Sequence, residues 1–101
     1  MNKSYDWDVE KAKSNQRKHG VSFDTATLVF SDVHALTEFE DYYGHEDRWH
    51  TTGMVQGELL LLVVHTGWDD DGLETIRIIS ARRANKSERF NYEKNLRQIY
   101  N

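Results

Sequence analysis

Residues 59–64 read LLLLVV, and this apolar run decides the fold class. A strand whose side chains are apolar on both faces is typical of the middle of a sheet, where helices or a partner chain cover each side. Around this run, apolar and polar residues alternate with a period of two, which is the spacing of strands that bury one face. The pattern predicts four strands in an antiparallel meander, near residues 33–40, 48–56, 58–66 and 74–80.

Three connecting segments are expected between these strands. The turn-prone run at residues 41–47 follows the first strand, and Gln56-Gly57 fits a tight hairpin turn after the second. The run from Gly67 to Gly72 contains three aspartates and is predicted to form a longer exposed loop.

A first helix is predicted before the sheet. Asp8 is a suitable N-cap for a helix that runs to about Lys18, and Gly20 follows where a left-handed residue closes a helix. The 3-4 spaced stripe of this helix is polar at Asn15 and His19, so it offers little apolar surface. We therefore expect the helix to dock through residues around the stripe, namely Trp7, Val9 and Val21.

Two further helices complete the predicted fold. Ser22 can cap a second helix, whose i, i+3, i+4, i+7 stripe is Phe23, Ala26, Thr27 and Phe30. Asn85 and Glu88 form a capping box for a third helix from about Lys86 to Ile99. Its stripe is expected to pack on the sheet through Tyr92, Leu96 and Ile99. The predicted fold is α+β, a single domain over residues 1–101, with two N-terminal helices, a four-stranded antiparallel meander and a C-terminal helix.

The composition excludes several classes of chemistry. The 101 residues include no cysteine, which excludes disulfides, thiolate zinc sites and cysteine nucleophiles. No stretch approaches the ~20 apolar residues of a membrane span, and the N-terminus lacks the apolar core of a signal peptide. We expect a cytoplasmic protein with one modest core.

The charge is distributed unevenly along the chain. The net charge of -4 taken alone opposes a nucleic-acid partner, because phosphate binding depends on Lys and Arg. Residues 1–20 carry a net +2, residues 21–76 carry -11 and residues 77–101 carry +5. The two basic ends can share one surface, and the acidic middle can steer a basic protein partner onto the sheet.

Several short stretches resemble, in their order and spacing, the BrnT family of bacterial toxins over nearly the whole chain. They are Trp7-Asp8, Lys11-Ala12, Asn15, residues 18–23 (KHGVSF), Ala26, Phe30, Glu46, Arg48-Trp49, Gly53, residues 76–82 (IRIISAR), Glu88 and Tyr92. The resemblance implies a RelE-like fold, ribonuclease activity that stops translation, and neutralisation by a partner antitoxin called BrnA. It also implies contact with operator DNA only through the antitoxin complex.

Metal-free cleavage of RNA requires a base for the 2′-hydroxyl, positive charge at the pentacoordinate phosphate and an acid for the 5′-oxygen. Arg77 and Arg82 are the candidates for the positive charge, since guanidinium groups donate paired hydrogen bonds to phosphate oxygens. Alternatively, Arg77 forms an ion pair with a carboxylate such as Glu46 or Glu88. The residues predicted to bind RNA are Lys18, Arg48, Arg83 and Arg89. Alternatively, Arg82 and Arg83 are only solvated surface residues, and Arg89 covers the third helix with its stem.

Proton transfer is assigned to histidine, which titrates nearest to neutral pH. His19 is the first candidate and His50 the second, although the dipole of the first helix also explains His19 as a capping residue. Glu88 is expected to orient an arginine or act as a base, unless it only caps the third helix. The remaining histidines are expected on the surface or in loops: His34, His45 and His65.

No metal and no cofactor is expected, because no pair of histidines has the i, i+4 spacing of a helical metal site. One rival hypothesis is a metal-dependent phosphodiesterase that uses His45, Glu46 and His50. Another is a catalytically inactive domain that binds its antitoxin and acts as a co-repressor. Exposed aromatic residues either stack on bases or complete the packing of the domain, namely Tyr42, Tyr43, Trp49 and Trp68.

Overall fold

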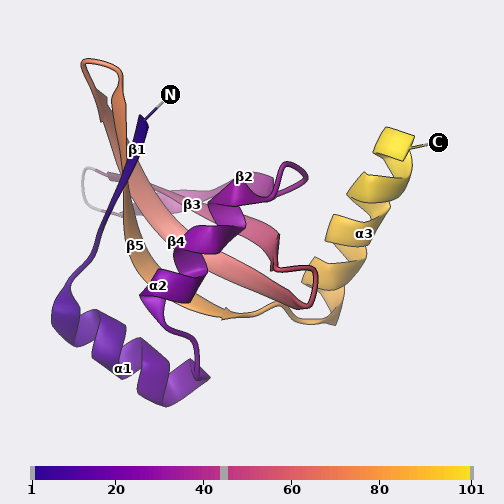
Figure 1. The fold of residues 1–101 in the computed structure, drawn as a ribbon, viewed down its shortest axis with the longest axis horizontal. Coiled ribbons are helices and arrows are strands. Elements are labelled where there is room, and N and C mark those ends of the chain that lie inside the picture. Colours follow the sequence, from indigo (N-terminus) through magenta and orange to yellow (C-terminus); the bar gives the residue numbers. More distant parts are fainter. Residues whose placement is uncertain (1, 44–45, 101) are drawn as a thin grey trace.

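The computed structural model describes residues 2–43 and 46–100, and it confirms the α+β class (Figure 1). The elements in chain order are β1 (Asn2–Asp6), α1 (Val9–His19), α2 (Phe23–Ala26), the 3-10 helix η1 (Thr27–Ser31), β2 (Leu36–Tyr43), β3 (Glu46–Val55), β4 (Leu59–Asp70), β5 (Leu73–Arg83) and α3 (Lys86–Tyr100).

The strands form one five-stranded sheet in the order β1-β5-β4-β3-β2. Strands β2 to β5 form the predicted antiparallel meander, with β4 in the middle of the sheet. The expected number of four strands is wrong, because β1 pairs in parallel with β5 and places Tyr5 opposite Ile76. Residues 2–6 read NKSYD and show no apolar alternation, so this strand depends on its partner rather than on a local pattern.

Two tight turns connect the long strands. Gln56 and Gly57 have φ angles of 54° and 74°, which confirms the predicted hairpin turn. The exposed loop expected at residues 67–72 is wrong, because β4 and β5 continue and only Asp71 and Gly72 turn the chain, with φ angles of 51° and 83°. Asp-Gly favours such a two-residue turn, so the aspartates mark a hairpin tip.

The run at residues 41–47 is also mostly strand rather than turn. β2 extends to Tyr43, which pairs with Glu46 at the start of β3. Gly44 and His45 lie outside the described residues. Strands that project into solvent carry exposed polar residues and therefore have the composition of a turn.

One face of the sheet packs against α1, α2 and η1 and forms the core. The buried apolar residues there are Val21, Phe23, Ala26, Val29, Val55, Leu61, Val63, Ile76, Ile78 and Ala81. The second helix is shorter than predicted, since one α-helical turn continues as η1, which brings Val29 against β3. A Cβ at Gly53 of β3 would lie only 2.8 Å from the Cβ of Val29. This close approach explains why a glycine stands inside a strand.

A single polar side chain attaches α1 to the edge of β5. In the described residues, β1 covers only the first part of this edge. Asn15 is buried at the uncovered part, where its amide donates to the Ala81 carbonyl at 2.8 Å and accepts from the Ala81 N–H at 3.1 Å. The side chain thus replaces the ladder bonds of a neighbouring strand. Docking through Val9 is wrong, because that side chain is 60% exposed, whereas Val21 and Trp7 do pack against the core.

α3 begins with the predicted capping box. The backbone N–H of Glu88 donates to Asn85 Oδ1 at 2.8 Å, and Glu88 Oε1 accepts from the Asn85 N–H at 2.9 Å. Tyr92 is buried but Ile99 is 53% exposed, so the predicted stripe packs at its first residue and not at its last. Accordingly, α3 stands apart from α1 and α2 in Figure 1. In the part of the chain that the structure describes, no helix is long and apolar enough to cross a membrane.

Candidate active site

The sheet face opposite α1 and α2 carries both arginines predicted to be catalytic. Ile76, Ile78 and Ala81 of β5 point into the core. Arg77 and Arg82 are their neighbours along the strand and therefore point to the opposite face. Both arginines are partly exposed, so they can meet a ligand that lies on this open face.

A bulge in β5 shapes the open face between these arginines. The ladder shifts its register between Val64 and His65, which leaves Ile79 of β5 without a partner. Bulges bend a strand and redirect the side chains around them. Beyond the bulge, Ser80 and Arg82 share the open face, where alternate residues of a strand lie about 7 Å apart.

Arg82 is held in place by Glu88 from the first turn of α3. Its Nη1 and Nη2 atoms each donate a hydrogen bond of 2.8 Å to the carboxylate. This bidentate hydrogen bond is the main reason why the pKa of Glu88 is lower than its ordinary value. It is also the main reason why the pKa of Arg82 is higher than its ordinary value. Glu88 also accepts the Asn85 N–H, so one carboxylate both caps α3 and positions Arg82.

Arg77 forms an ion pair with Asp6 of β1, not with Glu46 or Glu88 as the sequence suggested. The two residues are register partners at the end of the parallel β1–β5 ladder. Asp6 could not be identified as the partner from the sequence, because β1 was not predicted.

His50 lies on the open face between two carboxylates of β2. Its Nε2 is 3.5 Å from Glu38 Oε1, and its Nδ1 is 3.6 Å from Glu40 Oε2. Both glutamates reach the ring because the β2–β3 ladder also shifts register at this point. After the hydrogen bonds from Arg82 and Asn85 and the charge of Arg82, His50 is the smallest of the causes that lower the pKa of Glu88. His50 and the Arg82–Glu88 pair therefore act on each other electrostatically, a link that the sequence did not indicate.

His19 and Lys18 lie together in a separate hollow of about 200 Å³ between α1 and β5. The hollow is lined by Lys11, Ser14, Asn15, Lys18, His19, Ile79 and Ser80. None of the predicted arginines lines it, so the structure divides the predicted site residues into two groups. Ser80 connects them, since it forms part of the hollow and is the neighbour of Arg82 on the open face.

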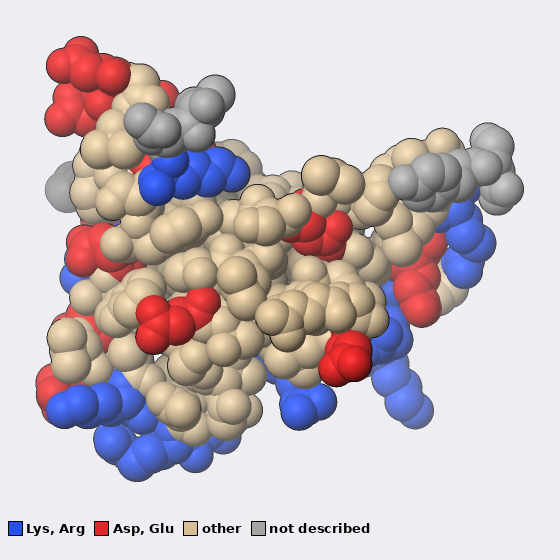
Figure 2. Space-filling view, viewed as in Figure 1, with Lys and Arg blue, Asp and Glu red and all other residues tan. Residues whose placement is uncertain are grey.

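The residues predicted to bind RNA do not lie together, because Arg48 stands beside Glu46 and Asp47 near the start of β3, whereas Arg83 ends β5 and Arg89 lies on α3. Arg83 is exposed on the opposite side of β5 from Arg82, Arg89 is exposed on α3, and Arg48 is half-buried on β3. Figure 2 shows Lys and Arg side chains gathered along the lower edge, over α1 and near the start of α3. Asp and Glu side chains gather at the upper left, over the tip of the β4–β5 hairpin.

His65 is not on the surface or in a loop, as expected from the sequence, but buried in β4. His65 is only 8% exposed. Its Nε2 lies 2.8 Å from Thr51 Oγ1, and its ring packs edge-on against Phe30. Burial lowers the pKa of His65 to about 4. The imidazole is therefore neutral at pH 7 and does not exchange protons near neutrality.

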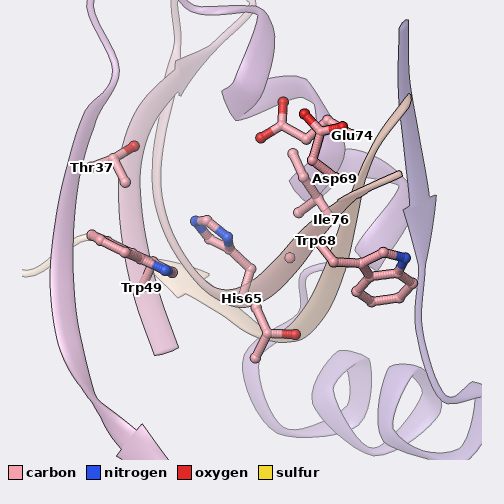
Figure 3. Close-up of a pocket in the computed structure, with 9 residues that line it drawn as sticks. Thr37, Trp49, His65, Trp68, Asp69, Glu74 and Ile76 are labelled. Carbon is pink, nitrogen blue, oxygen red and sulfur yellow. The ribbon is translucent and has the colours of Figure 1, made fainter. Parts of the chain in front are cut away.

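Two tryptophans remain outside the core. Trp49 is 37% exposed and Trp68 is 48% exposed. Both line a hollow of about 370 Å³ beside His65 (Figure 3). The side chains of Tyr42 and Tyr43 lie outside what the structure describes.

Among the described residues, no three His, Asp or Glu side chains are placed to hold a metal ion. His45, which the rival metal site required together with Glu46 and His50, lies outside the described residues. His50 instead contacts the carboxylates of Glu38 and Glu40.

Comparison with known proteins places these observations in a family. The profile of the family described as "Ribonuclease toxin, BrnT, of type II toxin-antitoxin system" matches residues 7–88, whereas no protein of curated function matches the sequence. The fold is similar to the crystal structure of the ribonuclease toxin BrnT of Brucella abortus, with a TM-score of 0.59 and 22% identity over 85% of this chain and 100% of that chain. The matched residues include α1, both open-face arginines and Glu88, and the chain therefore belongs to the BrnT family of ribonuclease toxins of type II toxin-antitoxin systems.

Proposed function

We propose that this chain is an RNA endonuclease that stops translation and is neutralised by a protein antitoxin of the BrnA type. One observation carries the proposal. Glu88 fixes the guanidinium of Arg82 on an open sheet face, two residues along β5 from a wall of the hollow that contains His19. A fixed cation near a histidine supplies two of the functions that phosphodiester cleavage needs, which are stabilisation of the developing charge and transfer of a proton.

In the proposed mechanism, Arg82 stabilises the charge that develops on the pentacoordinate phosphate. Its planar donors match the spacing of phosphate oxygens. Glu88 holds the guanidinium before the substrate arrives, so little reorganisation is required when the charge develops. Arg77, held by Asp6 on the same face, contributes to catalysis by contacting the neighbouring phosphate group.

His19 is the proposed proton carrier, taking the proton of the 2′-hydroxyl or giving one to the departing 5′-oxygen. Lys18 in the same hollow binds the adjacent phosphate. His50, between Glu38 and Glu40, is the second candidate for the proton transfer. The pH–rate profiles of His19→Gln and His50→Gln distinguish the two, because loss of the proton carrier removes one limb of a bell-shaped profile.

The remaining predicted contacts guide RNA along the basic edge. Arg83 and Arg89 are proposed to bind backbone phosphates together with Lys18, and Arg48 is proposed to bind a phosphate farther along the RNA, near the start of β3. Such contacts release counterions, so cleavage under subsaturating RNA should weaken steeply as salt concentration rises.

The direct test is incubation of the purified chain with end-labelled RNA, with and without EDTA. We expect cleavage in both reactions, because the proposed chemistry uses no metal. Arg82→Ala should lower the cleavage rate by about 10²–10³, the range for loss of one preorganised donor to a transition state. Arg97→Ala, which removes an exposed arginine from the last turn of α3, is the matched control and should leave the rate unchanged. Cleavage that disappears with EDTA would contradict metal independence.

One observation favours the alternative of a catalytically inactive domain that holds its antitoxin on operator DNA. Arg77 and Arg82 are each already paired with a carboxylate, which reduces the net positive charge on the open face. Intact RNA after incubation with micromolar wild-type protein, combined with antitoxin binding, would support this alternative over the nuclease.

A further inference from the structure

A hollow lined by aromatic and acidic side chains lies toward the tip of the β4–β5 hairpin, away from the basic edge. Its volume is about 370 Å³, and its walls include Trp49, Thr66, Trp68, Asp69 and Glu74. In Figure 3, Trp49 and Trp68 lie on either side of His65, and the carboxylates of Asp69 and Glu74 lie beyond it. This aromatic hollow plays no part in the proposed cleavage of RNA.

Large apolar side chains are exposed together around the aromatic hollow. Trp49 is 37% exposed and Trp68 is 48% exposed, and Phe39, which contacts Trp49, is 43% exposed. Phe39 packs edge-on against Trp49, with ring centroids 5.2 Å apart. Neighbouring exposed apolar groups of this size, rimmed by charged residues, are typical of a surface that binds another protein.

The charges around the hollow favour a cation. Asp69 and Glu74 are direct partners in the β4–β5 ladder, and like charges in such positions destabilise the pairing of strands. Residues 67–76 contain four acidic residues and no basic one. His65 adds no positive charge, because burial lowers its pKa to about 4. RNA is repelled from this end, whereas a cationic side chain would relieve the repulsion.

We propose that the aromatic hollow binds an arginine or lysine side chain from a basic segment of the antitoxin. The cation lies against the indole rings, which attract it through their π faces, and pairs with Asp69 and Glu74. Apolar residues of the same segment cover Phe39. The inference rests on the proposed antitoxin partner, and it places the antitoxin contact toward the tip of the β4–β5 hairpin, away from Lys18, Arg83 and Arg89.

The test measures the affinity of the antitoxin encoded in the same operon for matched charge variants, by titration calorimetry. Asp69→Asn combined with Glu74→Gln removes two charges from the hollow. Asp70→Asn combined with Asp71→Asn removes two charges from the same hairpin outside its lining, and asparagine tolerates the positive φ of 51° at position 71. We expect about tenfold weaker binding for the first pair, the scale of one cation–π contact or close charge pair, and a change below about twofold for the second.

A direct probe is the tripeptide acetyl-Arg-Leu-Arg-amide, followed by the NMR signals of the three tryptophan indole N–H groups. Trp7 packs against Phe23 with centroids 5.9 Å apart, so it is an internal control. We expect the signals of Trp49 and Trp68 to shift while that of Trp7 does not, and the shifts to be lost in Asp69→Asn combined with Glu74→Gln.

Three outcomes would overturn the inference. Equal weakening by both charge pairs means general attraction rather than a site, and no weakening means that the antitoxin binds elsewhere. Slower RNA cleavage by Trp68→Ala with unchanged antitoxin affinity means that the hollow holds a base. The proposed nuclease fails separately: wild-type protein that leaves RNA intact but binds antitoxin through this hollow refutes the cleavage and supports the inference.

Discussion

Replacing Asn15 with alanine tests how α1, and with it His19 and Lys18, is held against β5. The substitution removes both hydrogen bonds to Ala81, of 2.8 and 3.1 Å, and a third of 3.2 Å to the Val21 carbonyl. Ala81 is 0% exposed, so its N–H and carbonyl lose their partners in a buried place.

Each buried group left without a partner costs about 1–3 kcal/mol, and water that enters the vacated space recovers part of this. Alanine also favours the helix by up to ~0.7 kcal/mol relative to asparagine. We therefore expect Asn15→Ala to lower the free energy of unfolding by about 2–4 kcal/mol. Domains of this size have only about 5–15 kcal/mol of stability.

Urea unfolding followed by circular dichroism measures this change, and thermal unfolding should show a Tm lower by roughly 10–25 °C. Asn91→Ala is the matched control, because Asn91 is exposed on α3, and it should be neutral or slightly stabilising. Asn15→Asp should be at least as harmful as Asn15→Ala, since a carboxylate cannot donate to the Ala81 carbonyl. An Asn15→Ala protein within about 0.5 kcal/mol of the parent would refute the account of how α1 docks.

Three further changes have defined outcomes. The pKa of His65 falls from 6.5 in the unfolded chain to about 4 in the fold, so its contribution to stability is complete above pH 6.5 and is lost as pH falls. Urea unfolding should therefore show a loss of about 2 kcal/mol between pH 7 and pH 5 that is absent in His65→Gln. Gly53→Ala places a Cβ 2.8 Å from Val29 Cβ and should cost about 1–3 kcal/mol of unfolding free energy in the same assay. Gly67→Ala places a Cβ 3.0 Å from the Thr75 carbonyl oxygen on the exposed hairpin and should cost less. Arg82→Lys keeps the charge but loses the two-pronged bond to Glu88, and RNA cleavage should fall by at least about tenfold; cleavage at the parental rate would show that a point charge suffices.

The features that the sequence predicted correctly depend on neighbours a few residues apart. The caps of α1 at Asp8 and Gly20 and the capping box of α3 each involve residues within one helical turn. The central position of β4 follows from its own six-residue apolar run, LLLLVV. The pairing of Arg82 with Glu88 joins residues six apart, and the sequence did indicate Glu88 as an orienting group.

The features that were missed depend on contacts between distant residues. Arg77 and Asp6 are 71 positions apart, and Asn15 and Ala81 are 66 positions apart. An isolated stretch such as β1 contains no sign of the strand beside which it lies. The two carboxylates reach His50 only in the observed register of β2 on β3. A shift of one residue would turn their side chains to the other face of the sheet.

The parallel pairing of β1 with β5 also sets the order in which the molecule can be completed during its synthesis. After β1 has been translated, it must wait for a strand that is translated about seventy residues later. Until then Asp6 has no arginine partner and the edge of β5 does not exist. The guanidinium of Arg77 is thus fixed only after both strands have left the ribosome.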